Sequence, residues 1–236
     1  EWDFQLLIGE EPQEQGTLIF SGNKGVLKTL FREIELKNVE KNDTDISAEL
    51  EYRRKPFQLA GTIKGDQMEA IMRNENESYI LKATRFREAF VPIDRSGITY
   101  LLADGDLREY EQNIDHAGIL ASLDGAAFRR GEKIYNGNCI NCHGTPEIDG
   151  SIPLSKKFWS ETYKAGADPY SLYQTLSKGY GSMPPQVEMT PQEKYDVIHY
   201  IREEFIRKEN PTQYYRFGKD YLASLPKGTE TGPESK

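Results

Sequence analysis

The pattern of hydrophobic and polar positions changes between the first and second halves of the chain. Between about residues 17 and 110, apolar and β-branched side chains alternate with polar ones in short segments such as 45–52 and 78–84, the period of a β-strand with one buried face. Two such segments are separated by Gly65-Asp66, a pair suited to a tight hairpin turn. Because the connections are short, the sequence predicts an antiparallel β meander or small barrel in residues 1–123.

Helical spacing replaces this alternation after residue 123. Each of three segments combines a capping residue at its start with apolar positions three or four residues apart. The expected helices run from the cap Asp124 to Tyr135 with Gly137 past the end, from Asp168-Pro169 to Gly179, and from the capping box Thr190-Pro191-Gln192-Glu193 through Phe205. Such a small helical unit has little hydrophobic core, so we expect a bound cofactor to complete it.

The sequence therefore predicts a multidomain chain of β plus all-α class, divided into residues 1–123, 124–209 and 210–236. The last part has Pro and Gly among polar residues and lacks the apolar positions for a core of its own. We expect its aromatic stretch 214–221 to lie back on the folded domains, with only about the last ten residues free. The ending is typical of a linker, so we expect the chain to be one piece of a larger assembly or of a longer protein.

Composition and charge exclude some classes of protein. The chain has 236 residues and a formal net charge of −8, and residues 1–123 contain 15 basic and 23 acidic side chains. Phosphate binding needs clustered Lys and Arg, so no nucleic-acid partner is expected. No apolar run approaches the roughly 20 residues of a membrane-spanning helix. The first residues have neither the basic start nor the apolar stretch of a signal peptide, so we expect a chain that is already processed.

The candidate chemistry is carried by one motif, Cys139-Ile140-Asn141-Cys142-His143. Two thiols at this spacing can each form a thioether to a haem vinyl group, and the adjacent imidazole is then placed to ligate the iron. The alternatives are a zinc half-site and a redox disulfide. The chain has only two cysteines, which leaves no second pair for a four-thiolate zinc site, and the loop that follows lacks the βαβ setting of a redox disulfide. We therefore favour one covalent c-type haem.

Beyond this motif, the second part of the chain resembles the class I mono-haem cytochromes c. Gly131 and Tyr135 stand where that family keeps a glycine and an aromatic residue on its first helix, and Tyr200 stands where the family packs an aromatic residue against that glycine. Pro153 follows His143 by ten residues, where the family has a proline whose carbonyl accepts the proton of the proximal imidazole. The resemblance implies the same roles here. It does not extend to the β-rich part, in which we recognise no family.

The resemblance also implies a methionine as the sixth ligand of the iron. Met183 lies in a loop that resembles the family's distal loop, and the two prolines after it would stiffen that loop. Met189 is the rival ligand, but a residue directly before a helix cap has less freedom to face the iron. His116 and His199 are expected to be solvent-facing or packing residues. A pair of histidine ligands is the alternative if Met183 is not the ligand.

These ligands imply electron transfer. With His143 and Met183 on the two sides of the iron, no position is free for a substrate, so we expect an electron carrier that is not itself an enzyme. In bacterial members of the family, c-type attachment occurs outside the cytoplasm, which implies a periplasmic or secreted protein. The expected partner is a redox protein, either a dehydrogenase or a membrane respiratory complex. The acidic residues of 1–123 would help to dock it.

Two other classes of function remain open. One is a haem enzyme or sensor with five-coordinate iron. The other is a binding module in which the β-rich part recognises a carbohydrate or a protein and the haem is accessory. In that case a sugar site would be lined by aromatic residues such as Trp2, Tyr52, Phe57 and Tyr79, although at strand spacing such residues more often fill a core.

Overall fold

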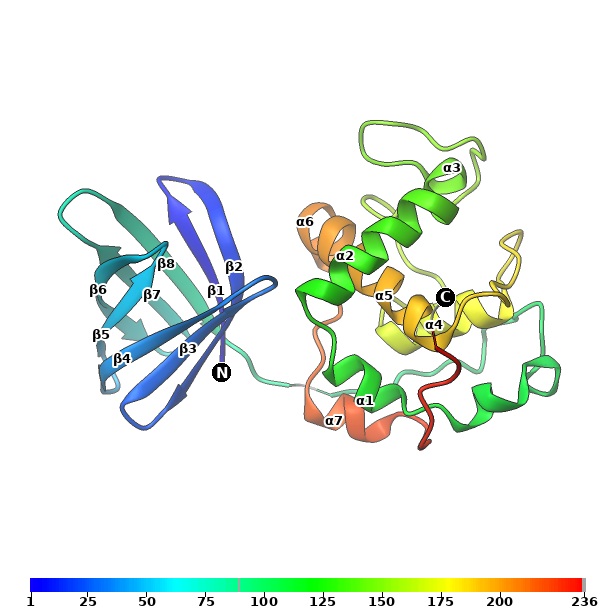
Figure 1. Cartoon of the computed structure of the whole chain (residues 1–236), viewed down its shortest axis with the longest axis horizontal. Helices are drawn as coiled ribbons and strands as arrows, with labels where there is room; N and C mark the ends of the chain where they lie inside the picture. The colour runs from blue at the N-terminus through cyan, green and yellow to red at the C-terminus, as the bar shows by residue number, and fades with distance from the viewer. Residues whose placement is uncertain (89, 235–236) are drawn as a thin grey trace. The chain divides into compact units, whose positions relative to one another are not determined.

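The structure is a computed structural model that describes residues 1–88 and 90–234. It contains two compact units, Glu1–Arg87 and Glu88–Lys236. The first is made of strands and the second mainly of helices and the segments that connect them (Figure 1). The sequence pattern placed the boundary after residue 123, whereas the compact units divide after Arg87. The boundary lies earlier because the last strand already ends at Arg85.

The first unit is a closed antiparallel barrel. Each strand pairs with the next one along the chain, and β1 pairs with β8 to close the barrel (Figure 1). Closure leaves no unpaired strand edge, which a meander would expose. The strands are β1 Trp2–Ile8, β2 Glu11–Ser21, β3 Lys24–Thr29, β4 Glu33–Lys41, β5 Asp45–Tyr52, β6 Lys55–Lys64, β7 Gln67–Arg73 and β8 Ser78–Arg85.

The alternation seen in the sequence sends one side of each strand into the barrel. In β7, Met68, Ala70 and Met72 are buried while the residues between them are exposed. The predicted hairpin is confirmed: β6 and β7 pair around Gly65, whose φ of 61° suits a tight turn and favours glycine.

Aromatic residues belong to the core of this barrel. Trp2, Tyr52, Phe57 and Tyr79 are each at most 3% exposed. The rings of the last three pack edge to face, with centroids 5.3 to 6.1 Å apart, a favourable geometry for aromatic pairs. These four side chains therefore belong to the core and do not line a surface site for a sugar.

The second unit is helical. Its α-helices are α1 His116–Ala121, α2 Gly125–Ile134, α3 Ile140–His143, α4 Pro169–Lys178, α5 Pro191–Ile201, α6 Arg207–Glu209 and α7 Lys219–Ser224. Shorter turns are η1 Asp104–Asp106, η2 Glu109–Asn113, η3 Tyr135–Cys139, η4 Arg202–Ile206 and η5 Pro211–Gln213, of which η3 and η4 are π-helical. Within the described part of the chain, no helix combines the length and the apolar character needed to cross a membrane.

The three predicted caps are confirmed. The side chains of Asp124, Asp168 and Thr190 accept hydrogen bonds from backbone N–H groups in the first turns of α2, α4 and α5. The predicted end at Gly137 is wrong. The helical run continues from α2 through η3 into α3 and ends only at Gly144, whose φ is 74°. Gly137 has open space around it and no positive φ, so nothing forces the helix to end there.

The tail is bound over most of its length. The carboxylate of Glu88 accepts hydrogen bonds from the backbone of Gly218, Asp220 and Tyr221 at the start of α7. Further on, the N–H of Asp115 donates to the carbonyl of Glu230 at 2.8 Å. The aromatic stretch therefore packs on the unit as expected, with Tyr221 buried. We expected about the last ten residues to be free, but the chain is bound as far as residue 230, so this expectation is wrong for that part of the tail. Residues 235 and 236 lie outside the described part.

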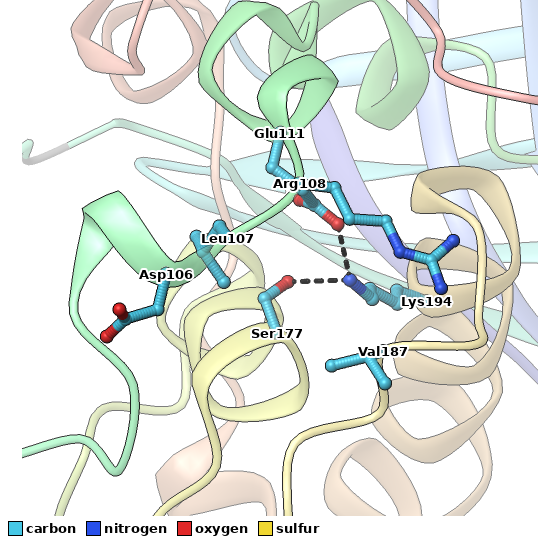
Figure 2. Close-up of a pocket in the computed structure, with 7 residues that line it drawn as sticks. All are labelled: Asp106, Leu107, Arg108, Glu111, Ser177, Val187 and Lys194. Carbon is cyan, nitrogen blue, oxygen red and sulfur yellow. Dashed lines mark hydrogen bonds and ion pairs between the residues drawn. The ribbon is translucent and has the colours of Figure 1, made fainter.

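A buried ion pair joins the segment before α1 to the helices. The ammonium of Lys194 on α5 lies 2.6 Å from the carboxylate of Glu111 on η2, and their side chains are only 2% and 4% exposed. Lys194 also donates to the hydroxyl of Ser177 on α4 (Figure 2). The Tyr173 hydroxyl donates to the carboxylate of Glu111. Burial lowers the pKa of Lys194, and the charge of Glu111 opposes that shift.

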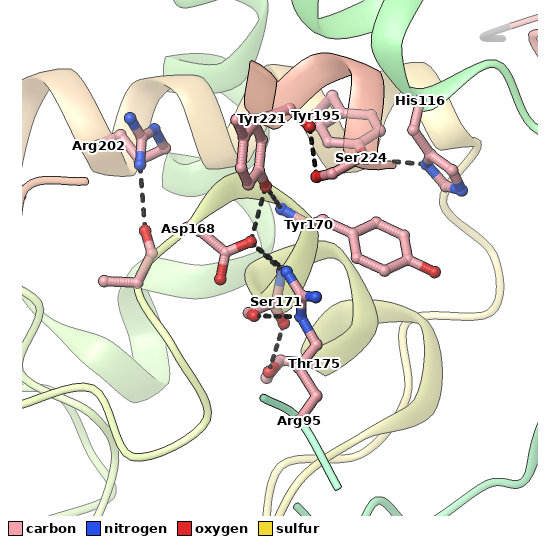
Figure 3. Close-up of polar contacts among 11 residues, drawn as sticks. Arg95, His116, Asp168, Tyr170, Ser171, Thr175, Tyr195, Arg202, Tyr221 and Ser224 are labelled. Atoms are coloured by element: carbon pink, nitrogen blue, oxygen red, sulfur yellow. Dashed lines mark hydrogen bonds and ion pairs between the residues drawn. The ribbon is translucent and has the colours of Figure 1, made fainter. Parts of the chain in front are cut away.

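A second polar cluster ties two other parts of this unit to the start of α4. The carboxylate of Asp168 is 1% exposed and accepts hydrogen bonds from the guanidinium of Arg95 and the hydroxyl of Tyr221, both at 2.7 Å (Figure 3). Arg95 also donates to the hydroxyl of Ser171 at 2.8 Å. The segment before α1 and the tail therefore belong to the same folded unit as the helices.

Candidate haem site

The three residues of the motif with reactive side chains share one face of a helix. Cys139 ends the π turn η3, and Cys142 and His143 lie on α3. Residues three and four apart on a helix point to the same side, so both thiols and the imidazole project together. Gly144 ends the helix directly after them with its positive φ.

The imidazole of His143 is held in a defined orientation. Its Nδ1 donates a hydrogen bond to the carbonyl oxygen of Lys156 at 3.0 Å, and its ring stacks on Phe158 with centroids 4.7 Å apart. Its Nε2 makes no hydrogen bond to any residue that the structure describes, so this nitrogen is available to a metal. Burial lowers the pKa of His143, which favours the neutral ring that a metal requires.

The carbonyl that orients this imidazole is not the one predicted. Pro153 is exposed, and Lys156, three residues later, supplies the hydrogen-bond acceptor. Every residue has the same backbone carbonyl, so no signal in the sequence could identify Lys156. The path of the loop after α3 decides which carbonyl reaches the ring.

Both cysteines are free and half-buried. Burial raises the pKa of Cys139 to about 11, and the charge of the neighbouring Cys142 adds a smaller rise in the same direction. Cys139 is therefore a thiol near neutral pH. Among residues 1–88 and 90–234, no group of three or more His, Cys, Asp or Glu side chains could hold a metal ion, so the zinc alternative has no complete ligand set there. Two thiols beside an imidazole with a free Nε2 fit a covalently held haem.

The other residues of the resemblance meet where α2 crosses α5. A Cβ atom on Gly131 would lie 2.0 Å from the carbonyl oxygen of Asp196 and 2.9 Å from the Cβ of Tyr200, so only glycine fits there. The ring of Tyr135 lies 5.4 Å from that of Tyr200, and its hydroxyl donates to the carbonyl of Gly144 at 2.7 Å. This crossing therefore supports the helix that carries the motif.

Met183 lies in a tight turn after α4. Tyr180 and Met183 exchange two backbone hydrogen bonds of 3.0 Å each. Gly179 and Gly181 adopt φ angles of 73° and 59° in this turn. The Met183 side chain is half-buried, whereas the rival Met189 is 7% exposed and packed before the cap of α5.

The two remaining histidines pack inside the second unit. His116 is 3% exposed, and its Nδ1 lies 2.8 Å from the hydroxyl of Tyr195. Burial lowers the pKa of His116 to about 4. His199 lies beside the ring of Phe128, and burial lowers its pKa as well. Neither is grouped with other potential metal ligands in the part of the chain that the structure describes.

Comparison with known proteins identifies one part of the chain. Residues 126–201 match the model of a family described as cytochrome C oxidase, cbb3-type, subunit III. The matched region holds the cysteine motif, the α2–α5 crossing and the Met183 turn, and the barrel lies outside it. No curated protein and no solved structure gives a significant match to the chain.

Proposed function

Because residues 126–201 form a class I c-type cytochrome domain, we propose that this chain transfers electrons through one covalently bound c-type haem. The observation that carries the proposal is the common helical face of Cys139, Cys142 and His143, with the imidazole oriented by the carbonyl of Lys156. Thioethers from the two cysteines would hold the haem, and Nε2 of His143 would ligate its iron.

Met183 is the proposed sixth ligand. The glycines at 179 and 181 let the chain turn back sharply, and Pro184 and Pro185 limit the motion of the loop after it. A thioether ligand raises the reduction potential relative to a second nitrogen ligand. With His143 and Met183 in place, no ligand position is open to a substrate, which favours an electron carrier over a five-coordinate enzyme or sensor.

The proposed partner is a membrane respiratory complex, met outside the cytoplasm. The matched family is described as a subunit of an oxidase, which favours such a complex over a soluble dehydrogenase as the partner. The barrel is the proposed docking part. Its outward positions carry exposed charges such as Glu35, Glu49 and Glu69, and charges of this kind steer association and fix orientation.

Extraction with acid–acetone tests whether the haem is covalently attached. Acid–acetone removes haem that is held only by ligation, whereas thioethers keep it on the protein. We expect one haem per chain to remain after extraction of the purified holoprotein. The double variant Cys139→Ala/Cys142→Ala should lose the haem, and Met189→Ala, which alters a buried residue outside the motif, should retain it. Extractable haem in the unaltered protein would overturn the assignment.

A further inference from the structure

A short segment before the cytochrome domain lies against the turn that carries Met183. This segment, residues 100–104, is called the strap below, and it precedes the family match at 126–201. The N–H of Leu101 donates to the carbonyl of Gly179 at 3.2 Å, and the N–H of Leu102 donates to that of Lys178 at 3.0 Å. The strap therefore pairs with the end of α4 as a short strand would.

Side chains reinforce this pairing. Tyr100 forms an antiparallel bridge with Tyr180, and their rings lie 6.3 Å apart in an edge-to-face arrangement. The ammonium of Lys178 lies 5.2 Å from the centre of the Tyr100 ring and 2.5 Å from the carboxylate of Asp104. The Lys178 side chain is only 11% exposed, whereas that of Asp104 is 84% exposed, so water screens the ion pair and the contact with the ring is the better shielded of the two.

The strap and Met183 meet at Gly179. A Cβ atom added to Gly179 would lie 2.9 Å from the Leu101 Cδ1 atom, from the Met183 carbonyl oxygen and from the Pro185 Cδ atom. Tyr180, which the strap pairs with, also exchanges both backbone hydrogen bonds with Met183. An unbroken series of contacts thus runs from the strap to the backbone of Met183.

We propose that Tyr100 is a positioning residue for Met183 and that the strap holds the Met183 turn in the geometry of the sixth ligand. The inference rests on the proposed function. A loop that is free to move loses conformational entropy when its ligand binds the iron. A strap that already restrains the loop makes this loss smaller. Weakening the strap therefore favours the state in which Met183 has left the iron.

The ring of Tyr100, rather than its hydroxyl, carries the contact. The hydroxyl oxygen is buried and has no hydrogen-bond partner among the residues that the structure describes. Removing a polar atom that makes no hydrogen bond has little cost, whereas removing the ring loses its contacts with Tyr180 and Lys178. Tyr100→Phe is therefore a matched control for Tyr100→Ala.

The test measures how readily imidazole, added to the oxidised holoprotein, replaces Met183. We expect Tyr100→Ala to raise the apparent affinity for imidazole about tenfold, or about 1.4 kcal/mol, and Tyr100→Phe to stay close to the unaltered protein. Circular dichroism and thermal unfolding of the same samples report on the fold. If Tyr100→Ala fails to fold, Leu102→Pro replaces it, because proline removes the N–H that bonds to the carbonyl of Lys178 and so weakens the strap without changing Tyr100. The same tenfold rise is expected.

The variant Met183→Ala separates the two proposals. If it opens the iron to imidazole while the strap variants bind imidazole as the unaltered protein does, the strap inference is wrong and the ligand assignment stands. If Met183→Ala itself leaves imidazole binding unchanged, the ligand assignment fails. An equal rise in Tyr100→Phe and Tyr100→Ala would contradict the role of the ring.

Discussion

The guanidinium of Arg130 on α2 donates two hydrogen bonds, of 2.6 and 2.9 Å, to the carboxylate of Asp196 on α5. The next residue, Gly131, touches the backbone carbonyl of the same aspartate. Two neighbouring positions on α2 therefore engage one residue of α5, the first through its charge and the second through the absence of a side chain. This crossing sets the separation of the two helices beside the haem motif.

Substitution of Gly131 should separate these helices. The added methyl group of Gly131→Ala would overlap backbone atoms, so we expect a loss of about 1–3 kcal/mol or more in the free energy of unfolding, measured by denaturant titration. Gly137→Ala is the matched control, since this glycine also lies on the helical run but has open space around it. That variant should be neutral or more stable by about 0.5–1 kcal/mol. Equal losses in the two variants would contradict the close crossing.

Substitution of Met183 should open the iron. In Met183→Ala we expect carbon monoxide to bind the reduced holoprotein and the reduction potential to fall, because the sulfur ligand is lost. Met189→Ala should bind no carbon monoxide and keep its potential, since this buried side chain packs before α5. Spectroscopic titration and potentiometry provide the two measurements. The reverse result for the two methionines would assign the ligand to Met189, and no binding in either would favour two histidine ligands.

The stability of the second unit should depend on the protonation of His116. Burial lowers the pKa of His116 from 6.5 to about 4 in the folded protein, so the unfolded chain binds the proton more readily between these values. The neutral ring stabilises the fold above pH 6.5, and this contribution of about 3 kcal/mol is lost as the pH falls toward 4.

Charges near the His116 ring shift its pKa in opposite directions. Asp115 raises the pKa of His116 and Lys194 lowers it, while Tyr170, Tyr173 and Tyr195 surround it. The measurement is the free energy of unfolding at pH 7.0 and 4.5 for the unaltered protein and for His116→Gln, which cannot take up the proton. The variant should lose less stability on acidification. Equal losses would show that His116 does not contribute to the pH dependence.

The buried ion pair of Lys194 and Glu111 should respond unequally to single and double substitution. Lys194→Met leaves the carboxylate of Glu111 buried without its cation, and we expect a loss of about 3–5 kcal/mol. The double variant Lys194→Met/Glu111→Met removes both charges and should lose less than the single variant. Denaturant titrations of the unaltered protein, of Lys194→Met, of Glu111→Met and of the double variant check this order. A double variant as unstable as the sum of the two single variants would indicate that the charges do not interact.

The sequence by itself determined much of the local structure and predicted the chemistry. The spacing of Cys139, Cys142 and His143 predicted the haem motif, and the caps at Asp168 and Thr190 predicted the starts of two helices. Strand alternation predicted which side chains face the barrel interior. These features depend on residues close together in the chain, so the sequence pattern contains them.

Only the tertiary structure decided which distant residues serve the candidate site. The carbonyl of Lys156 replaces that of Pro153 at the imidazole, and the strap at Tyr100 reaches the Met183 turn across a long stretch of chain. The pairing of β1 with β8, which closes the barrel, likewise joins residues that are far apart in the sequence. Backbone groups are identical in every residue, and their pairing depends on the path of the whole chain, which no local pattern of side chains encodes.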